Sequence, residues 1–243
     1  MQHIHPENLI IIDIETASVS PSFDKLDEEW RTLWEEKVSR SLPEGVAAPE
    51  FYSMRAGVMA EFAKIICISI GYFNRETTLH MRVKSFYGHD EKKILSDFLA
   101  TINKIESLNS KWCFAGHNIK EFDIPFICRR LIINNFKIPA YLDFQNMKPW
   151  ETNIVDTFQY WRFGDYKNYT SLKLLAAAMG VPSPKDDIDG SMVGELYWAE
   201  ADREANLKRI AVYCQKDVIT TGNIILRFRN MPQVPPEDIR IVE

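Results

Sequence analysis

This sequence is short of several features that define whole classes of protein. Its 243 residues include four cysteines, namely Cys67, Cys113, Cys128 and Cys214. None of them forms a Cys-x-x-Cys pair, so we expect buried thiols in a reducing compartment and no structural zinc site. The longest apolar runs, Ile65–Ile70 and Leu174–Met179, are far shorter than the ~20 residues that span a bilayer. The first residues lack the basic-then-apolar pattern of a secretory signal. We therefore expect a cytoplasmic protein with no membrane contact.

Positive charge is also scarce. The chain has 29 Lys and Arg against 34 Asp and Glu, which gives a formal net charge of −5. Proteins that coat long duplexes by neutralising phosphates are usually basic, so the charge balance argues against that class. It is compatible with an enzyme that grips a short nucleic-acid end, because bound metal cations supply positive charge where carboxylates cluster.

The distribution of apolar residues predicts an α/β fold. Asn8–Ile14 is an isoleucine-rich run typical of a buried central strand, and Lys64–Phe73 with Thr77–Phe86 indicates a hairpin. Helical periodicity then alternates with short strands, which favours a mixed sheet covered by helices on both faces. We expect helices over 90–105, 123–134, 171–179 and 202–229, and short strands over 112–115 and 153–157. The chain reads as one domain, 1–243, with a helical insertion at about 18–60 and a short Pro-rich C-terminal tail.

Asp13 and Glu15 are the first candidate functional residues. They lie two apart at the end of a predicted buried strand, so both side chains point to the same side. Two adjacent carboxylates repel each other unless something compensates, and a divalent cation commonly does so. The alternative is a turn acid and a helix cap.

Two further acidic positions lie on predicted helices. Asp123 begins one of them, where Asp is a favoured N-cap and Pro125 fits the first turn, so capping and a functional role are both open. Tyr213 and Asp217 are four residues apart on the C-terminal helix and share a face. A tyrosine hydroxyl beside a carboxylate can position a water or share its proton, although a half-buried Tyr with a solvated Asp would look the same in sequence.

Taken together, these positions resemble the DnaQ-like (DEDDy) 3′–5′ exonucleases, which have a ribonuclease H-like fold. Three motifs carry the resemblance, in order: Asp13-Ile14-Glu15-Thr16, then Asn118 followed after three residues by Phe122-Asp123, then Tyr213 followed after three residues by Asp217. The His branch of the group has histidine five residues before the last Asp, where this sequence has Val212. The nearest resemblance is to the exonuclease domain of family-B DNA polymerases and its free-standing bacterial relatives, over about Leu9 to Arg229.

The resemblance implies a site with two divalent cations, Mg²⁺ or Mn²⁺. Asp13, Glu15 and Asp217 would hold one ion, and Asp13 with Asp123 would help to hold the second. Tyr213 would orient the attacking water, and Glu15 with the Thr16 backbone amide would meet the terminal 3′-hydroxyl. Asn118 and Phe122 are expected to contact the substrate.

The implied activity is metal-dependent hydrolysis of single-stranded nucleic acid from its 3′ end, with DNA preferred, to release nucleoside 5′-monophosphates. Partners would be single-stranded 3′ ends and replication or repair proteins. An exoribonuclease or oligoribonuclease is one alternative, because discrimination depends on contacts near the 2′-hydroxyl. A non-catalytic nucleic-acid-binding accessory protein is the other. The oligomeric state stays open.

Overall fold

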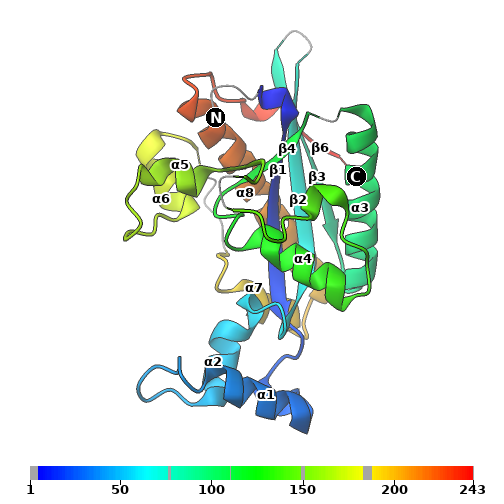
Figure 1. The fold of residues 1–243 in the computed structure, drawn as a ribbon, viewed down its shortest axis with the longest axis vertical. Helices are drawn as coiled ribbons and strands as arrows, with labels where there is room; N and C mark the ends of the chain where they lie inside the picture. The colour runs from blue at the N-terminus through cyan, green and yellow to red at the C-terminus, as the bar shows by residue number, and fades with distance from the viewer. Residues whose placement is uncertain (1–4, 76–77, 110, 149–150, 183–187, 243) are drawn as a thin grey trace.

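A mixed six-stranded sheet forms the centre of the molecule. The computed structural model describes residues 5–75, 78–109, 111–148, 151–182 and 188–242 (Figure 1). The strand order is β5-β4-β1-β2-β3-β6, and β2 runs antiparallel to both of its neighbours while all other pairs are parallel. The strands are β1 (Leu9–Ser18), β2 (Ala63–Arg75), β3 (Leu79–Tyr87), β4 (Cys113–Gly116), β5 (Ile154–Asp156) and β6 (Ile239–Val242). The predicted α/β fold with a mixed sheet is therefore confirmed.

Helices cover both faces of this sheet. They are α1 (Glu28–Val38), α2 (Ala48–Arg55), α3 (Glu91–Leu108), α4 (Asp123–Ile133), α5 (Thr157–Arg162), α6 (Leu172–Met179), α7 (Val193–Trp198) and α8 (Arg203–Phe228). Helices α3 and α4 pack on one face and α8 on the other. No helix in the described ranges is long and apolar enough to cross a membrane.

Strand β1 is buried on both faces, which explains its run of isoleucines. Ile10 and Ile12 belong to the core on the α3–α4 side, whereas Leu9 and Ile11 belong to the core under α8. Because side chains alternate along a strand, the odd-numbered positions that follow also face α8. The polar end of β1 is therefore directed at that helix.

Helix α8 packs directly on the backbone of β2 at a position that has no side chain, Gly71. A Cβ built on Gly71 of β2 would come within 2.6 Å of Val218 Cγ1 on α8. Only glycine allows this approach without displacement of the valine. The contact therefore sets how close α8 lies to β2 at Val218, the residue that follows Asp217.

The expected insertion forms an arm that extends past one end of the sheet (Figure 1). Its helices, α1 and α2, enclose a small core around Trp34, whose ring lies 5.1 Å from Tyr52 and 5.0 Å from Phe62, centroid to centroid. Thr16 Oγ1 donates to Gly57 O at 2.6 Å and so ties the end of the arm to β1.

The Pro-rich tail ends in a strand that the sequence did not predict. Residues of β6 pair in parallel with β3 from Met81 to Lys84. The strand covers an edge of the sheet that would otherwise expose unpaired backbone groups.

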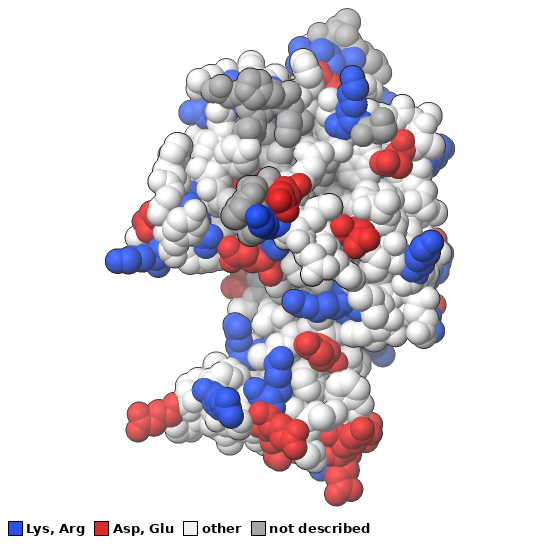
Figure 2. Space-filling view, viewed as in Figure 1, with Lys and Arg blue, Asp and Glu red and all other residues white. Residues whose placement is uncertain are grey.

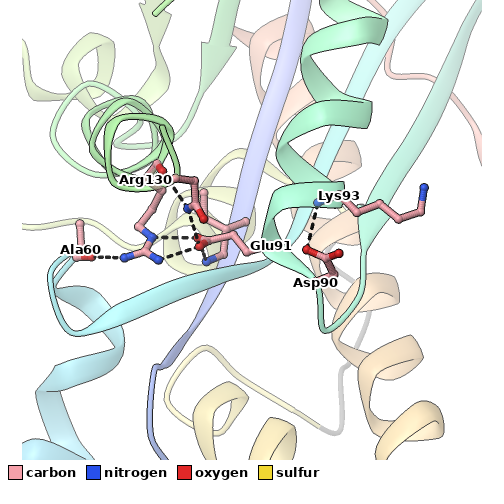
Figure 3. Close-up of polar contacts among 7 residues, drawn as sticks. Ala60, Asp90, Glu91, Lys93 and Arg130 are labelled. Atoms are coloured by element: carbon pink, nitrogen blue, oxygen red, sulfur yellow. Dashed lines mark hydrogen bonds and ion pairs between the residues drawn. The ribbon is translucent and has the colours of Figure 1, made fainter. Parts of the chain in front are cut away.

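A buried ion pair locks one end of the fold (Figure 3). Arg130 of α4 donates from Nε and Nη2 to the two carboxylate oxygens of Glu91 on α3, at 2.8 and 2.6 Å. Arg130 also donates to Ala60 O at 2.8 Å, and Glu91 accepts from the Ile65 amide at 2.7 Å and from Asn134 Nδ2 at 2.8 Å. This hydrogen-bonded charge pair therefore joins helices α3 and α4 to strand β2 and to the end of the arm.

Candidate active site

The first two carboxylates lie where the odd-numbered face of β1 meets α8. Glu15 is buried and Asp13 is partly buried. Asp13, Glu15 and Cys214 each offer a ligand-type atom within 4.8 Å of the others. Cys214 Sγ donates to the Asp13 backbone oxygen at 3.4 Å, and burial raises the pKa of this thiol well above its usual value. Cys214 is therefore a neutral hydrogen-bond donor that anchors α8 to β1.

The third carboxylate reaches β1 from the opposite layer. Asp123 is the first residue of α4, and the N-cap position belongs to Phe122. Asp123 Oδ1 accepts a hydrogen bond from the Ile14 amide at 3.1 Å. This amide is accessible because β4 pairs only with Leu9 to Ile11 and leaves the rest of that edge of β1 open. The capping interpretation of Asp123 is therefore wrong, since its side chain binds β1.

The fourth carboxylate and the tyrosine come from α8. Tyr213 and Asp217 lie one turn apart, and a hydrogen bond to Asp217 contributes to the raised pKa of the Tyr213 hydroxyl. Burial is the largest cause of that rise, and the charges of Asp217, Glu15 and Asp13 follow. The hydroxyl therefore stays protonated at neutral pH and faces the carboxylates.

The four acids, which we call the carboxylate cluster (Asp13, Glu15, Asp123 and Asp217), perturb one another electrostatically. Burial raises the pKa of Asp13 well above its usual range, and Asp217 and Asp123 raise it further. Burial likewise raises the pKa of Glu15, with Asp13 and Asp217 next in importance. For Asp123, burial outweighs its hydrogen bonds and raises the pKa to about 7. Sequence positions spread over some two hundred residues are thus brought into one site.

The cluster has the character of a divalent-cation site. Asp13 Oδ2 is buried and has no hydrogen-bond partner among the residues that the structure describes. A buried anionic oxygen without a partner is costly, and a bound cation would satisfy it. The donor set is carboxylate oxygen, which suits Mg²⁺ or Mn²⁺ better than zinc. The residues present therefore fit the ions that the resemblance implied.

A supporting network positions the turn before α4. Asp156 Oδ1 accepts from the amides of Asn118 and Phe158 at 2.9 and 3.0 Å, and its Oδ2 accepts from the Lys120 amide at 3.0 Å. Asn118 has φ of 63°, a left-handed conformation that Asn tolerates well. Its buried Oδ1 has no hydrogen-bond partner within the described part of the chain. Asp156 therefore holds the backbone of the turn through its amides, and Asn118 Oδ1 remains available as a hydrogen-bond acceptor.

The remaining predicted residues have structural contacts. The Thr16 hydroxyl is occupied by Gly57 O, so only its backbone could serve a ligand. Phe122 is partly buried and packs on Phe126, with ring centroids 5.4 Å apart.

A second segment lies beside the turn that leads into α4. His117 Nε2 donates to Thr170 O at 3.0 Å and Arg162 pairs with Glu121 at 3.0 Å, so both ends of the stretch 162–170 contact this turn.

Comparisons with known proteins place these observations in a family. A family model described as "predicted 3′–5′ exonuclease related to the exonuclease domain of PolB" matches residues 58–234. The match includes Asp123, Tyr213 and Asp217, and it begins after Asp13 and Glu15. No curated protein matches the chain.

Among solved structures, the chain is similar to the family B DNA polymerase from the hyperthermophilic archaeon Pyrobaculum calidifontis. The sequences are 16% identical, with a TM-score of 0.49. The alignment covers 93% of this chain and 24% of the polymerase, so the chain spans about a quarter of that protein.

Proposed function

Because this chain belongs to the family of predicted 3′–5′ exonucleases related to the exonuclease domain of PolB, we propose that it removes nucleotides one at a time from the 3′ end of single-stranded nucleic acid. DNA is the preferred substrate, in keeping with the polymerase relationship of the family, and nucleoside 5′-monophosphates are the products. The observation that carries this proposal is the convergence of four carboxylates on one buried site with an unsatisfied oxygen at its centre. Such an enzyme would trim ends during DNA replication or repair, beside the proteins of those processes.

We assign the metal ligands to the carboxylate cluster. Asp13, Glu15 and Asp217 would hold one divalent cation, and Asp13 with Asp123 would hold a second. When bound, two such ions stabilise the attacking and leaving oxygens of an in-line displacement at phosphorus. The ions would also remove the mutual repulsion that raises the pKa values of these acids.

The protein's own groups position the reactants. Tyr213 keeps its proton because its pKa is raised, so its hydroxyl orients the attacking water as a hydrogen-bonding group and not as a base. Glu15 and the backbone amide of Thr16 bind the terminal 3′-hydroxyl. Because only the end of a nucleic-acid strand has this hydroxyl, the contact restricts cleavage to the 3′ end. Asn118 Oδ1 and the Phe122 ring contact the terminal nucleotide. The water oxygen bonds to phosphorus and releases a proton, the bond from phosphorus to the 3′-oxygen of the preceding nucleotide breaks, and one proton is returned to that leaving oxygen, so that the overall change is the addition of one water.

A gel assay tests the proposed function. Purified protein is mixed with a 5′-labelled single-stranded DNA, and in parallel with the matching RNA, in the presence of Mn²⁺ or EDTA. We expect a ladder that shortens from the 3′ end only with Mn²⁺, faster for DNA, and no shortening by Asp13→Asn. Absence of shortening would instead support a nucleic-acid-binding accessory protein, and cleavage by Asp13→Asn equal to that of the wild type would overturn the assignment of the site.

A further inference from the structure

Three aromatic side chains project into solvent from the segment between α5 and α6. Phe163, Tyr166 and Tyr169 are 90%, 78% and 67% exposed. One exposed ring is unremarkable, but three exposed aromatic side chains within seven residues are a concentration that calls for an explanation. Tyr169 packs on Phe158, with ring centroids 5.1 Å apart. The Tyr166 ring lies near the Arg162 guanidinium, whereas the Phe163 ring is almost fully exposed.

The backbone at Phe163 adds a second, independent observation. Phe163 follows the last residue of α5 and has φ of 43° and ψ of 34°, in the left-handed region. Helices that end this way usually place Gly or Asn at this position, and Gly164 is the very next residue. A bulky residue in a strained conformation with its ring in solvent indicates a functional constraint.

The segment is attached to the turn that carries the third carboxylate. Arg162 pairs with Glu121, two residues before Asp123, and its guanidinium carbon lies 3.9 Å from the centre of the Phe158 ring and 5.7 Å from that of Tyr166. Thr170 O accepts from His117 at 3.0 Å. Both ends of the segment that carries the exposed rings are therefore attached to the turn that leads into Asp123.

The charge of the lobe that carries the rings indicates an anionic ligand. Residues 157–179 carry three basic residues, Arg162, Lys167 and Lys173, against one acid, Asp165. Lys167 and Lys173 are exposed, and Figure 2 shows both basic and acidic side chains on the lobe of α5 and α6. Flat rings beside cations match a single strand, whose bases stack while its phosphates contact basic groups. A duplex cannot use such rings, because its bases are already stacked on one another.

We propose that Phe163, Tyr166 and Tyr169 form a stacking surface for the unpaired bases on the 5′ side of the 3′-terminal nucleotide; this inference rests on the proposed function. Every base has a flat face, so the surface binds without sequence preference. It selects single-stranded ends, since only unpaired bases can lie on the rings. The three side chains are positioning residues and do not touch the reacting phosphate.

Binding to an intact and a base-free strand tests this inference. The Asp13→Asn protein in Mn²⁺ keeps the strand uncut, and fluorescence anisotropy measures its Kd for a labelled single-stranded DNA. In that protein, Phe163→Asn and Tyr166→Ala are each expected to raise the Kd about 5- to 100-fold. Asn favours the left-handed conformation, so Phe163→Asn removes the ring without harm to the backbone.

A second strand with abasic sites at the second to fourth positions from its 3′ end separates stacking from other contacts. Neither variant should change the Kd for this strand, and Tyr87→Ala, which removes an exposed tyrosine on β3, should change neither Kd. An unchanged Kd for the intact strand, or an equal loss for both strands, would overturn the stacking surface. Because binding is read without cleavage, this result is independent of whether the wild-type protein shortens DNA.

Discussion

The backbone amide of Ile14 donates to the carboxylate of Asp123 at 3.1 Å, across 109 residues of sequence. Ile14 stands between Asp13 and Glu15, so one hydrogen bond sets the third carboxylate beside the first two. The bond uses a part of β1 that β4 does not reach. The geometry of the carboxylate cluster is thereby fixed by the backbone as well as by side-chain packing.

Two substitutions at Asp123 should separate its structural role from its chemical role. Asp123→Asn keeps an oxygen that accepts from Ile14 and removes a charge from a repulsive cluster, so the protein should be at least as stable as the wild type. Asp123→Ala leaves a buried amide without a partner and should lower the free energy of unfolding by about 1–3 kcal/mol. Urea denaturation measures this difference. Both variants should lose cleavage about 100-fold or more, and equal stability of the two would contradict the structural role.

Tyr213→Phe should reduce turnover while it preserves the fold. The ring still packs on the core under α7 and α8, but the hydroxyl that orients water is lost, and we expect kcat to fall about 100-fold with KM unchanged. Tyr197→Phe is the matched control, because Tyr197 belongs to the same core and its hydroxyl bonds to His89 at 3.1 Å. Steady-state kinetics with Mn²⁺ measure kcat and KM of both variants. An equal loss of kcat in Tyr213→Phe and Tyr197→Phe would indicate an effect of packing and not of the Tyr213 hydroxyl.

Metal binding should stabilise the protein more at pH 8 than at pH 5. Burial and mutual repulsion raise the pKa values of Asp13 and Glu15, and that of Asp123 to about 7. An acid whose pKa is raised in the folded state favours folding at low pH, and this contribution is lost as the pH rises from about 4 through the folded pKa. Bound Mn²⁺ replaces the lost protons, so its stabilising effect should grow over the same range.

Thermal melting with Mn²⁺ or EDTA at several pH values measures this effect. Burial lowers the pKa of His117, which acts in the opposite direction over part of the range. That contribution is common to both conditions and cancels in the difference between them. A metal-induced shift in Tm that is constant with pH, or one that persists in Asp13→Asn, would argue against the cluster as the metal site.

The ion pair of Glu91 and Arg130 should matter for stability and not for chemistry. Arg130→Met leaves Glu91 as an uncompensated buried charge and should cost about 3–5 kcal/mol in urea unfolding. Lys93→Met, which breaks the exposed pair of Lys93 with Asp97 one turn along α3, should leave the unfolding curve essentially unchanged. A fully folded Arg130→Met protein should retain cleavage, and loss of kcat without unfolding would contradict this assignment.

The sequence predicted those helices and strands whose apolar residues recur at a regular, short spacing. The isoleucines of β1 and the apolar spacing in α3 and α8 identify their elements because burial imposes periods of 2 and 3.6 residues. The motif residues Asp13, Asp123 and Asp217 were placed by their order along the chain. The mixed sheet was predicted from the alternation of strands and helices, and the observed strand order confirms it.

Other features depended on contacts that no local pattern encodes. Asp123 looked like a helix cap because Asp favours that position, and only the open edge of β1 shows where its side chain goes. The hydrogen bond from the Thr16 hydroxyl to Gly57 O of the arm is likewise a long-range contact, and the prediction for the Thr16 backbone amide is unaffected by it. Strand β6 forms because β3 offers an edge, and its three preceding prolines suggested only a tail. Exposure of Phe163 is a property of the folded surface and has no signature in the sequence.

The order in which the cluster is synthesised limits when the site can form. Asp13 lies on the first strand, whereas Asp217 lies on the long helix α8, and at 5–20 residues per second the interval between their syntheses is roughly 10–40 s. A nascent chain in that interval carries Asp13 and Glu15, gains Asp123 about half-way through, and acquires Tyr213 and Asp217 only at the end. The carboxylate cluster therefore assembles only after most of α8 has been made.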